Sequence, residues 1–167
     1  CESELTNSYS LTDSQKSLIP ITKYNELQYL DNHGFYYIAT TQPREIVGYT
    51  RSPGAESCKY STHERMWTYL NFLSKGFVVR IELDASYDTN FELYKLNEGA
   101  PFGDLFDLSC TWDSIPLEER MKDTTIMGIN FKNVFVFKDC SNGSSINQIL
   151  YSPENGIEFI EYKNGDF

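Results

Sequence analysis

Three residues with the side chains of a nucleophilic site lie close together in the chain: Cys58, His63 and Glu64. A cysteine nucleophile needs its thiolate in contact with a base, and a third group that orients the base. No further sequence pattern supports a nucleophilic pair of Cys58 and His63. A histidine exposed in the first turn of a helix is the simpler interpretation of His63. A small hydrolase is therefore kept only as a less favoured alternative.

The sequence offers few groups that bind metal ions. It has two histidines, and His63-Glu64 is not the helical zinc motif because position 67 is Trp67 rather than histidine. Carboxylates gather between residues 104 and 123, but without the spaced Asp/Asn pattern of an EF-hand loop. Solvated loop charges explain them better than a glycosidase pair does. We therefore expect no enzyme activity, no metal and no cofactor.

Aromatic residues in expected loops are the best candidates for contact with a partner. The chain has 12 Tyr and 11 Phe, and most of these are expected in the core or on a sheet face. Trp112 lies in a polar loop, where it could either grip a partner or cover the core. Phe102, Phe106, Tyr49 and Arg51 are the other candidates.

The charge balance limits the kinds of partner. The chain has 24 acidic and 14 basic residues, which gives a formal net charge of −10. Nucleic-acid binding needs clusters of Lys and Arg, so no nucleic-acid partner is expected. The same charge disfavours close approach to an anionic lipid surface. Specific contacts with a protein are the expected mode of attachment.

These candidates must be positioned by the secondary structure, and the strongest helix pattern covers residues 61–76. Ser61 and Glu64 have the spacing of a capping box, and Gly76 is the expected end. The apolar face of this helix would carry Met66, Trp67, Leu70 and Leu73. A shorter helix is expected over residues 23–33.

Most other segments resemble strands. Alternating or apolar runs cover residues 34–40, 77–83, 91–96, 130–139, 146–151 and 157–162. The last three are joined by the turn sequences SNGSS and SPENG, which predicts an antiparallel meander. The predicted class is α+β: an antiparallel sheet of five or six strands with one main packed helix. It occupies residues 20–167 as a single domain.

The start of the chain predicts a lipid anchor. Lipoprotein maturation cuts immediately before a cysteine and acylates it, and Cys1 is followed by a Ser/Thr-rich acidic stretch without Gly or Pro. Residues 1–19 are thus expected to be a lipid-anchored flexible tether. A chance boundary at a cysteine is the alternative. Among the remaining cysteines, Cys110 with Cys140 is the favoured pairing for a disulfide, and three free buried thiols are an equally plausible alternative.

The anchor, the tether and the C-terminal stretch ILYSPENGIEFIEYKNGDF together resemble small outer-membrane lipoproteins of the Bacteroidota type. The resemblance implies an outer-membrane location with lipid on Cys1. The acidic Glu2-Ser3-Glu4 is similar to surface-export signals of that group, so the cell surface is favoured over the periplasmic face. Asp113-Ser114-Ile115 resembles their O-glycosylation motif, with a helix N-cap at Ser114 as the alternative.

These observations favour a non-enzymatic, lipid-anchored accessory subunit of an envelope complex. A translocon, a barrel-assembly machine or a transporter would be its partner. The first alternative is a surface glycan-binding lipoprotein, which predicts two or more coplanar exposed aromatic rings. An inhibitor or immunity lipoprotein is a further alternative.

Overall fold

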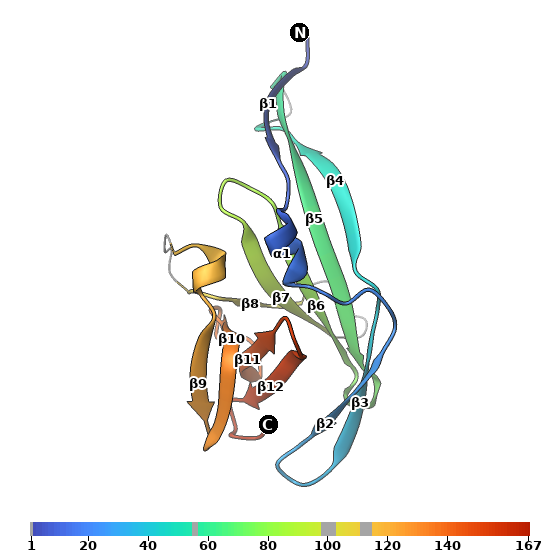
Figure 1. The fold of residues 1–167 in the computed structure, drawn as a ribbon, viewed down its shortest axis with the longest axis vertical. Helices are drawn as coiled ribbons and strands as arrows, with labels where there is room; N and C mark the ends of the chain where they lie inside the picture. The colour runs from blue at the N-terminus through green and yellow to red at the C-terminus, as the bar shows by residue number, and fades with distance from the viewer. Residues whose placement is uncertain (1, 55–56, 98–102, 111–114) are drawn as a thin grey trace.

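The computed structural model describes residues 2–54, 57–97, 103–110 and 115–167. In this part of the chain, twelve strands form one large curled sheet that is mainly antiparallel, accompanied by one short α-helix (Figure 1). The elements are β1 (Glu4–Tyr9), α1 (Asp13–Ser17), β2 (Glu26–Leu30), β3 (Tyr36–Thr41), β4 (Glu45–Arg51), β5 (Lys59–Phe72), the 3-10 helix η1 (Leu73–Lys75), β6 (Phe77–Asp84), β7 (Asn90–Asn97), β8 (Asp104–Asp107), the 3-10 helix η2 (Leu117–Glu119), β9 (Lys122–Ile126), β10 (Ile129–Asp139), β11 (Ile146–Ser152) and β12 (Gly156–Tyr162).

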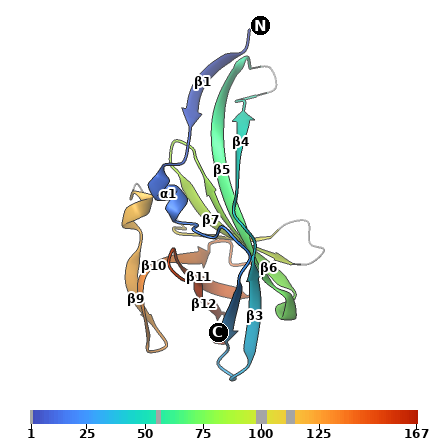
Figure 2. The ribbon, with the colours of Figure 1, turned by 45° about the vertical axis from the view of Figure 1, so that its right-hand side comes forward.

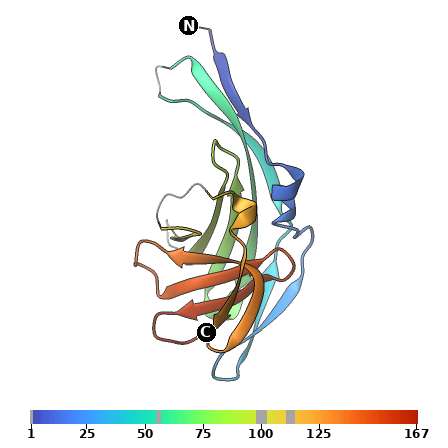
Figure 3. The ribbon, with the colours of Figure 1, turned by 60° about the vertical axis from the view of Figure 1, so that its left-hand side comes forward.

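The sheet runs in the order β12-β11-β10-β8-β7-β6-β5-β3-β2, with β1 and β4 paired to β5 and β9 paired to β10. It curls until its two edge strands approach each other. The Tyr29 hydroxyl in β2 donates a hydrogen bond of 2.9 Å to the carbonyl of Ile157 in β12. Figure 3 shows the result, with the C-terminal strands crossing in front of the lower part of β5 to β7.

The core lies inside this curl. Alternate residues of neighbouring strands point inward, as the pleat of a sheet requires. Leu70, Ile81, Leu93, Phe106 and Phe137 are fully buried and come from five different strands. Burial of each such side chain contributes roughly 1.5–3 kcal/mol to the hydrophobic stabilisation.

The expected main helix over residues 61–76 is wrong, because most of this segment is the long central strand β5. The inward-facing residues Met66, Thr68, Leu70 and Phe72 are all buried and alternate with half-exposed ones. Residues four apart lie on the same face of a helix and also on the same face of a strand, so the burial of Met66 and Leu70 is compatible with either element. Leu73, which only the helix would bury, is 77% exposed.

The predicted fold class is therefore corrected from α+β to mostly β. The short helix expected over residues 23–33 is wrong as well, since β2 occupies part of it and pairs antiparallel with β3. The strands expected at 34–40, 77–83, 91–96, 130–139, 146–151 and 157–162 correspond to β3, β6, β7, β10, β11 and β12. The antiparallel meander of β10, β11 and β12 is confirmed.

The N-terminal segment differs from the expected tether. Residues of β1 pair in parallel with β5, and α1 begins at a capping box formed by Thr12 and Gln15. Leu11, Leu18 and Ile19 are buried in the core. Residues 4–19 are thus part of the fold, and Cys1 lies outside the described residues.

One end of the molecule is a narrow three-stranded extension, which we call the arm. It consists of β1, the first half of β5 and β4, and it projects away from the curled body (Figure 2). In the described residues, neither β1 nor β4 pairs with a strand on its outer edge.

The predicted disulfide is confirmed: Cys110 and Cys140 are bonded, with their Cα atoms 5.1 Å apart. It ties the chain just after β8 to the end of β10. These two strands already pair with each other in the sheet, so the disulfide adds a covalent link between neighbouring strands.

Candidate functional site

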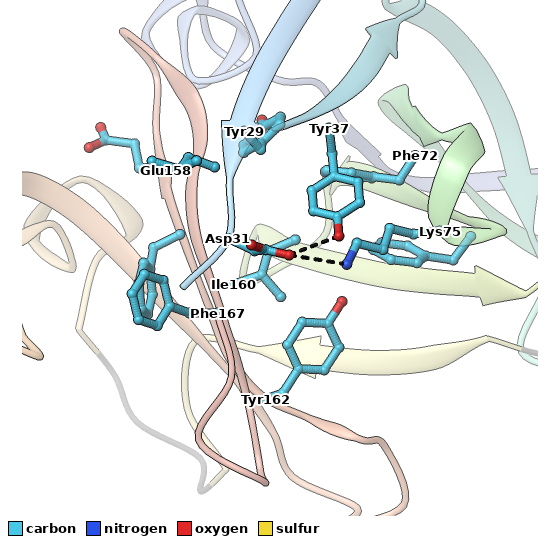
Figure 4. Close-up of a pocket in the computed structure, with 12 residues that line it drawn as sticks. Tyr29, Asp31, Tyr37, Phe72, Lys75, Glu158, Ile160, Tyr162 and Phe167 are labelled. Carbon is cyan, nitrogen blue, oxygen red and sulfur yellow. Dashed lines mark hydrogen bonds and ion pairs between the residues drawn. The ribbon is translucent and has the colours of Figure 1, made fainter. Parts of the chain in front are cut away.

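The two edge strands of the curled sheet are joined by single hydrogen bonds rather than by a ladder, and a cleft lies between them (Figure 4). It has a hollow of about 80 Å³ walled mainly by aromatic rings, which we call the apolar hollow, and an adjoining hollow of about 300 Å³ lined mainly by residues of polar type, which we call the polar hollow. Both hollows are lined by Asp31, Lys75, Tyr162 and Phe167. We call the two hollows together the β2–β12 cleft.

Aromatic rings wall the apolar hollow. Tyr29 lies on the inward face of β2. Phe72 and Phe77 come from the hairpin between β5 and β6, where their rings stack with their centres 4.8 Å apart. Ile160 and Phe167 close the opposite side. The alternation of the strands places these side chains inside the curl, at the point where the core opens to solvent.

Asp31 fixes the turn between β2 and β3 at the mouth of the cleft. One carboxylate oxygen accepts the backbone N–H groups of His33 and Phe35, each at 2.9 Å, and the other accepts the Tyr37 hydroxyl at 2.8 Å. Partial desolvation acts to raise the pKa of Asp31, but these hydrogen bonds together lower it below its usual range. The side chain is therefore ionised at neutral pH and holds the turn as an acceptor.

Lys75 stands over this turn, at the end of η1. Its Nζ atom lies 3.7 Å from the centre of the Tyr37 ring and 3.9 Å from Asp31 Oδ2. The next residue, Gly76, has a positive φ of 69°, which ends the 3-10 helix and turns the chain into β6. The Lys75 side chain is 35% exposed, and its contacts with the described residues leave donor capacity toward the cleft.

Asp166 forms the other lip of the polar hollow. Its carboxylate accepts hydrogen bonds from the side-chain amides of Asn32 at 3.3 Å and Asn164 at 2.7 Å, and it pairs with His33 Nε2 at 3.2 Å. The two amide donors lower the pKa of Asp166. Nearby, burial raises the pKa of Tyr162, so its hydroxyl stays neutral.

The titration and composition of the cleft residues limit the chemistry they can do. Both carboxylates have lowered pKa values, which makes them poor proton donors near neutral pH. Within the described residues, no group of three or more His, Cys, Asp or Glu side chains could hold a metal ion. What remains is an aromatic wall beside hydrogen-bond donors and acceptors, the composition of a small-ligand site.

A second charged cluster lies on the sheet face opposite the core. Arg65 donates to Asp84 through both Nε and Nη2, at 3.0 and 2.5 Å, and the Tyr49 hydroxyl donates to the same carboxylate at 2.7 Å. Glu82 pairs with Arg65 and Arg80. Burial raises the pKa of Glu82, although the two arginines act against this. Apart from the buried Arg80 Nε, which has no hydrogen-bond partner among the described residues, these groups satisfy one another across β4, β5 and β6, so the cluster supports the sheet.

His63 has a structural position in the same face. Its Nδ1 lies 2.8 Å from the Ala85 carbonyl, and its Nε2 lies 2.8 Å from the Ser61 hydroxyl. The ring also packs between Tyr9 and Tyr49. Both ring nitrogens are engaged, and neither contacts Cys58 in the described structure. The arrangement does not favour a cysteine–histidine nucleophile.

The residues predicted to contact a partner are spread over the fold. Phe106 lies in β8 and is fully buried, so it is unavailable to a partner. Tyr49 is held by Asp84, whereas Arg51 is exposed at the end of β4, on the arm. Phe102, Trp112, Ser114 and the anchor residue Cys1 lie outside the described residues.

Sequence reasoning missed the cleft. None of the predicted partner residues that the structure describes lines it. The polar residues of the mouth come from two turns that are far apart in the chain, at 31–34 and 164–166. The only signal was the turn chemistry of Asp-Asn-His-Gly and Asn-Gly-Asp, which predicts turns but not their neighbourhood.

Comparison of the chain with protein-family models, with curated proteins and with solved structures found no match. In the part of the chain that the structure describes, no helix is long and apolar enough to cross a membrane.

Proposed function

We propose that the protein is a non-enzymatic, lipid-anchored accessory subunit of a bacterial envelope complex, attached to the outer membrane through Cys1. The observation that supports a partner protein is the arm. A three-stranded extension that packs little against the body adds little to the stability of the body. Stability alone therefore does not explain why the arm is there.

The arm has the properties of a surface that receives another chain. Its outer strands β1 and β4 are almost entirely exposed. They present unpaired backbone groups along their outer edges, which proteins usually cover or blunt unless another strand is added there. Leu5, Ile46 and Val47 are 50%, 43% and 39% exposed, which adds apolar area to these edges.

The position of the arm relates it to the anchor. β1 begins at Glu4, three residues after Cys1. Three extended residues span at most about 10 Å, so a lipid on Cys1 would hold the arm at the headgroup layer. The net charge of −10 disfavours resting on anionic lipid. A membrane-embedded protein beside the anchor is the partner that fits this geometry.

The test is site-specific photo-crosslinking of the full-length protein in membranes of a bacterium that processes lipoproteins. A crosslinking amino acid at Leu5 or Val47 should capture one integral membrane protein. The same group at Tyr87, which is 86% exposed in the turn after β6, should not. Val47→Asp should abolish the adduct, whereas Leu73→Asp, at an exposed site away from the arm, should leave it. Equal capture from arm and control positions overturns the proposal.

The anchor needs its own measurement. Membrane-extracted protein should have an intact mass higher than the polypeptide by a glycerol and its acyl chains, and Cys1→Ala should release it to the soluble fraction. A Cys1 sulfur that is unmodified, or that a reducing agent frees from a disulfide, contradicts the anchor while leaving the role of the arm testable.

A further inference from the structure

We infer that two copies of this chain pair through the outer edges of their β4 strands, antiparallel and about a two-fold axis at Gly48. The two arms then form one continuous sheet. This pairing goes beyond the proposed attachment to a membrane protein, and it needs neither the lipid nor that protein. It rests on the direction of the backbone groups of β4, on the length of its free edge and on its charges.

The hydrogen bonds of β5 show which of its residues face β4. The Gln42 N–H, at the end of β3, donates to the Tyr69 carbonyl, and the Ala85 N–H, after β6, donates to the Glu64 carbonyl. Backbone groups alternate in direction along a strand. Odd-numbered residues of β5 therefore point their backbone groups toward β3 and β4, and even-numbered residues point theirs toward β1 and β6.

The same alternation identifies the free backbone groups of β4. In the register of the β4–β5 pair, the odd-numbered residues of β4 lie opposite odd-numbered residues of β5 and bond to them. The residues that present their N–H and C=O groups at the outer edge are thus Ile46, Gly48 and Thr50. In the described residues, no other strand pairs with this edge (Figure 2).

The free edge is short and has Gly48 at its centre. On one side, the Arg44 N–H is taken by the Ile21 carbonyl, and on the other side Pro53 has no N–H. Between these limits lie the seven residues of β4, which include neither Pro nor Lys. An edge strand without such protecting residues is a template for another strand.

Pairing about Gly48 uses all of the free groups. Gly48 faces Gly48 of the second copy, and Ile46 faces Thr50 of the second copy, each as a hydrogen-bonded pair that exchanges two bonds. Packing within one copy does not require this glycine, because its φ is not positive and an added Cβ would meet the His63 carbonyl oxygen at 3.9 Å, an ordinary contact. Glycine inside a strand often marks the close approach of another backbone.

The side chains of β4 are complementary to themselves in this register. Glu45 faces Arg51 of the second copy at both ends of the pairing. These are non-hydrogen-bonded pairs, in which the side chains of an antiparallel sheet lie closest. Among the described residues, neither Glu45 nor Arg51 has an ion-pair partner in its own chain. Between them, Val47 faces Tyr49, a favourable pair of a β-branched and an aromatic residue.

Other registers lose this match. A shift of the axis by one residue, to Val47 or to Tyr49, places one of the two charges opposite Pro43 or Pro53 and removes both Glu–Arg pairs. Because one strand from each copy forms the contact, the interface is smaller than the standard size, and we expect a weak dimer with a Kd in the micromolar range.

The pairing is compatible with the proposed membrane partner, since it leaves the β1 edges of both copies free. A crosslinking group at Val47 then gives two adducts of different mass, one with the membrane protein and one with a second copy. The dimer is measured with purified protein alone, so a failure of the dimer and a failure of the proposed function give different results.

Sedimentation velocity of the intact protein over micromolar concentrations tests the inference. The parent protein should form a dimer as the concentration rises. Glu45→Arg and Arg51→Glu each place like charges opposite one another at both ends of the pairing, so each should raise the dimer Kd by about tenfold or more. The double variant Glu45→Arg/Arg51→Glu has the net charge of the parent and should restore the dimer.

A mixture of the two single variants is the sharper test. In a mixed dimer, the two arginines of one copy face the two glutamates of the other, so the mixture should form dimers that neither variant forms alone. Glu4→Arg, at an exposed site on β1, makes the same change in net charge as Glu45→Arg and should leave the Kd within about twofold.

The register has an independent test in engineered cysteines. Gly48→Cys should form a disulfide between copies under mild oxidation, because the paired Cα atoms would lie about 5.5 Å apart. Thr50→Cys should not, since the two copies of this residue lie on opposite sides of the axis. This comparison replaces the charge variants if one of them fails to fold.

Three results would overturn the inference. The first is a parent protein that remains a monomer at every concentration. The second is a dimer that Glu45→Arg and Arg51→Glu leave unchanged, or that Glu4→Arg weakens equally. The third is equal crosslinking of Gly48→Cys and Thr50→Cys.

Discussion

The hydroxyl of Tyr29 donates to the carbonyl of Ile157 at 2.9 Å and so joins the two edge strands of the sheet, 128 residues apart in the chain. It holds β2 near β12 without closing a ladder between them. The β2–β12 cleft lies between these edges, and the Asn32 N–H donates to the Phe167 carbonyl across it at 3.2 Å. Burial raises the pKa of Tyr29, which keeps the hydroxyl protonated as the donor.

Replacement of this hydroxyl should loosen the curl. We expect Tyr29→Phe to lower the free energy of unfolding by about 0.5–1.5 kcal/mol, because the Ile157 carbonyl loses its partner. Urea denaturation measures the change. Tyr36→Phe is the matched control, since Tyr36 is 73% exposed on the other face of the same hairpin and should change stability by less than about 0.5 kcal/mol. Equal effects in both variants would mean that the bond does not join the edges.

Separate substitutions of Leu70 and Leu73 distinguish the strand β5 from the helix that the sequence predicted. Leu70→Ala should cost about 2–5 kcal/mol of stability, since Leu70 is fully buried in β5. Leu73→Ala should change stability by less than about 0.5 kcal/mol, because Leu73 is 77% exposed. Thermal or urea unfolding gives both values. A large loss in both variants is the pattern of a buried helix face and would contradict the structure.

The disulfide should contribute through the unfolded state. Cys110 and Cys140 are separated by 30 residues, and the chain-entropy model gives roughly 3–4 kcal/mol for a loop of that size. The double variant Cys110→Ser/Cys140→Ser should lose about this much in unfolding experiments without reductant. A double variant as stable as the parent protein would show that the bond does not form.

Asp139 should make stability depend on pH. Desolvation opposes its charge, but hydrogen bonds from Ser141, Lys163 and Ser144 win and lower the pKa of Asp139 to about 2. Because this pKa is below the usual value of 3.8, the ionised form is favoured by folding. Its contribution, about 2 kcal/mol, is complete above about pH 5 and is lost as the pH falls from about 5 to about 2.

The check is a comparison of Asp139→Asn with the parent protein across this range. The stability difference should be largest near neutral pH and should shrink toward zero as the pH approaches 2. Asp123→Asn is a useful control, because the Asp123 side chain accepts one exposed backbone hydrogen bond from Asn133. A difference that does not change with pH would contradict a lowered pKa at Asp139.

Part of the fold could be predicted from local patterns. The alternation of Phe77, Val79, Ile81 and Leu83 predicts a strand with one buried face, and β6 has that face in the core. The turn sequences SNGSS and SPENG predict the meander of β10 to β12. These predictions succeed because the pleat and the turn chemistry depend on residues that are neighbours in the chain.

The helix prediction for residues 61–76 failed for a physical reason. Met66 and Leu70 are four residues apart, a spacing that both a helix and a strand place on one face. The strand is favoured by its neighbours: β5 receives backbone hydrogen bonds from β6, β4, β3 and β1 along its length. The strand at residues 4–9 was missed for the same reason. Its parallel pairing with β5 joins positions more than 50 residues apart, which a local sequence pattern does not show.

The sequence by itself determined the alternating strands, the turns between them and the acidic charge. It left the Cys110–Cys140 disulfide and three free thiols as equal alternatives, and the structure decided between them. Only the tertiary structure decided where the candidate site lies. The curl of the sheet brings Asp31 and Lys75 to Asp166 from the opposite end of the chain, and the packing of β8 buries Phe106. Such proximity depends on how a twelve-stranded sheet closes, a long-range property that no local periodicity records.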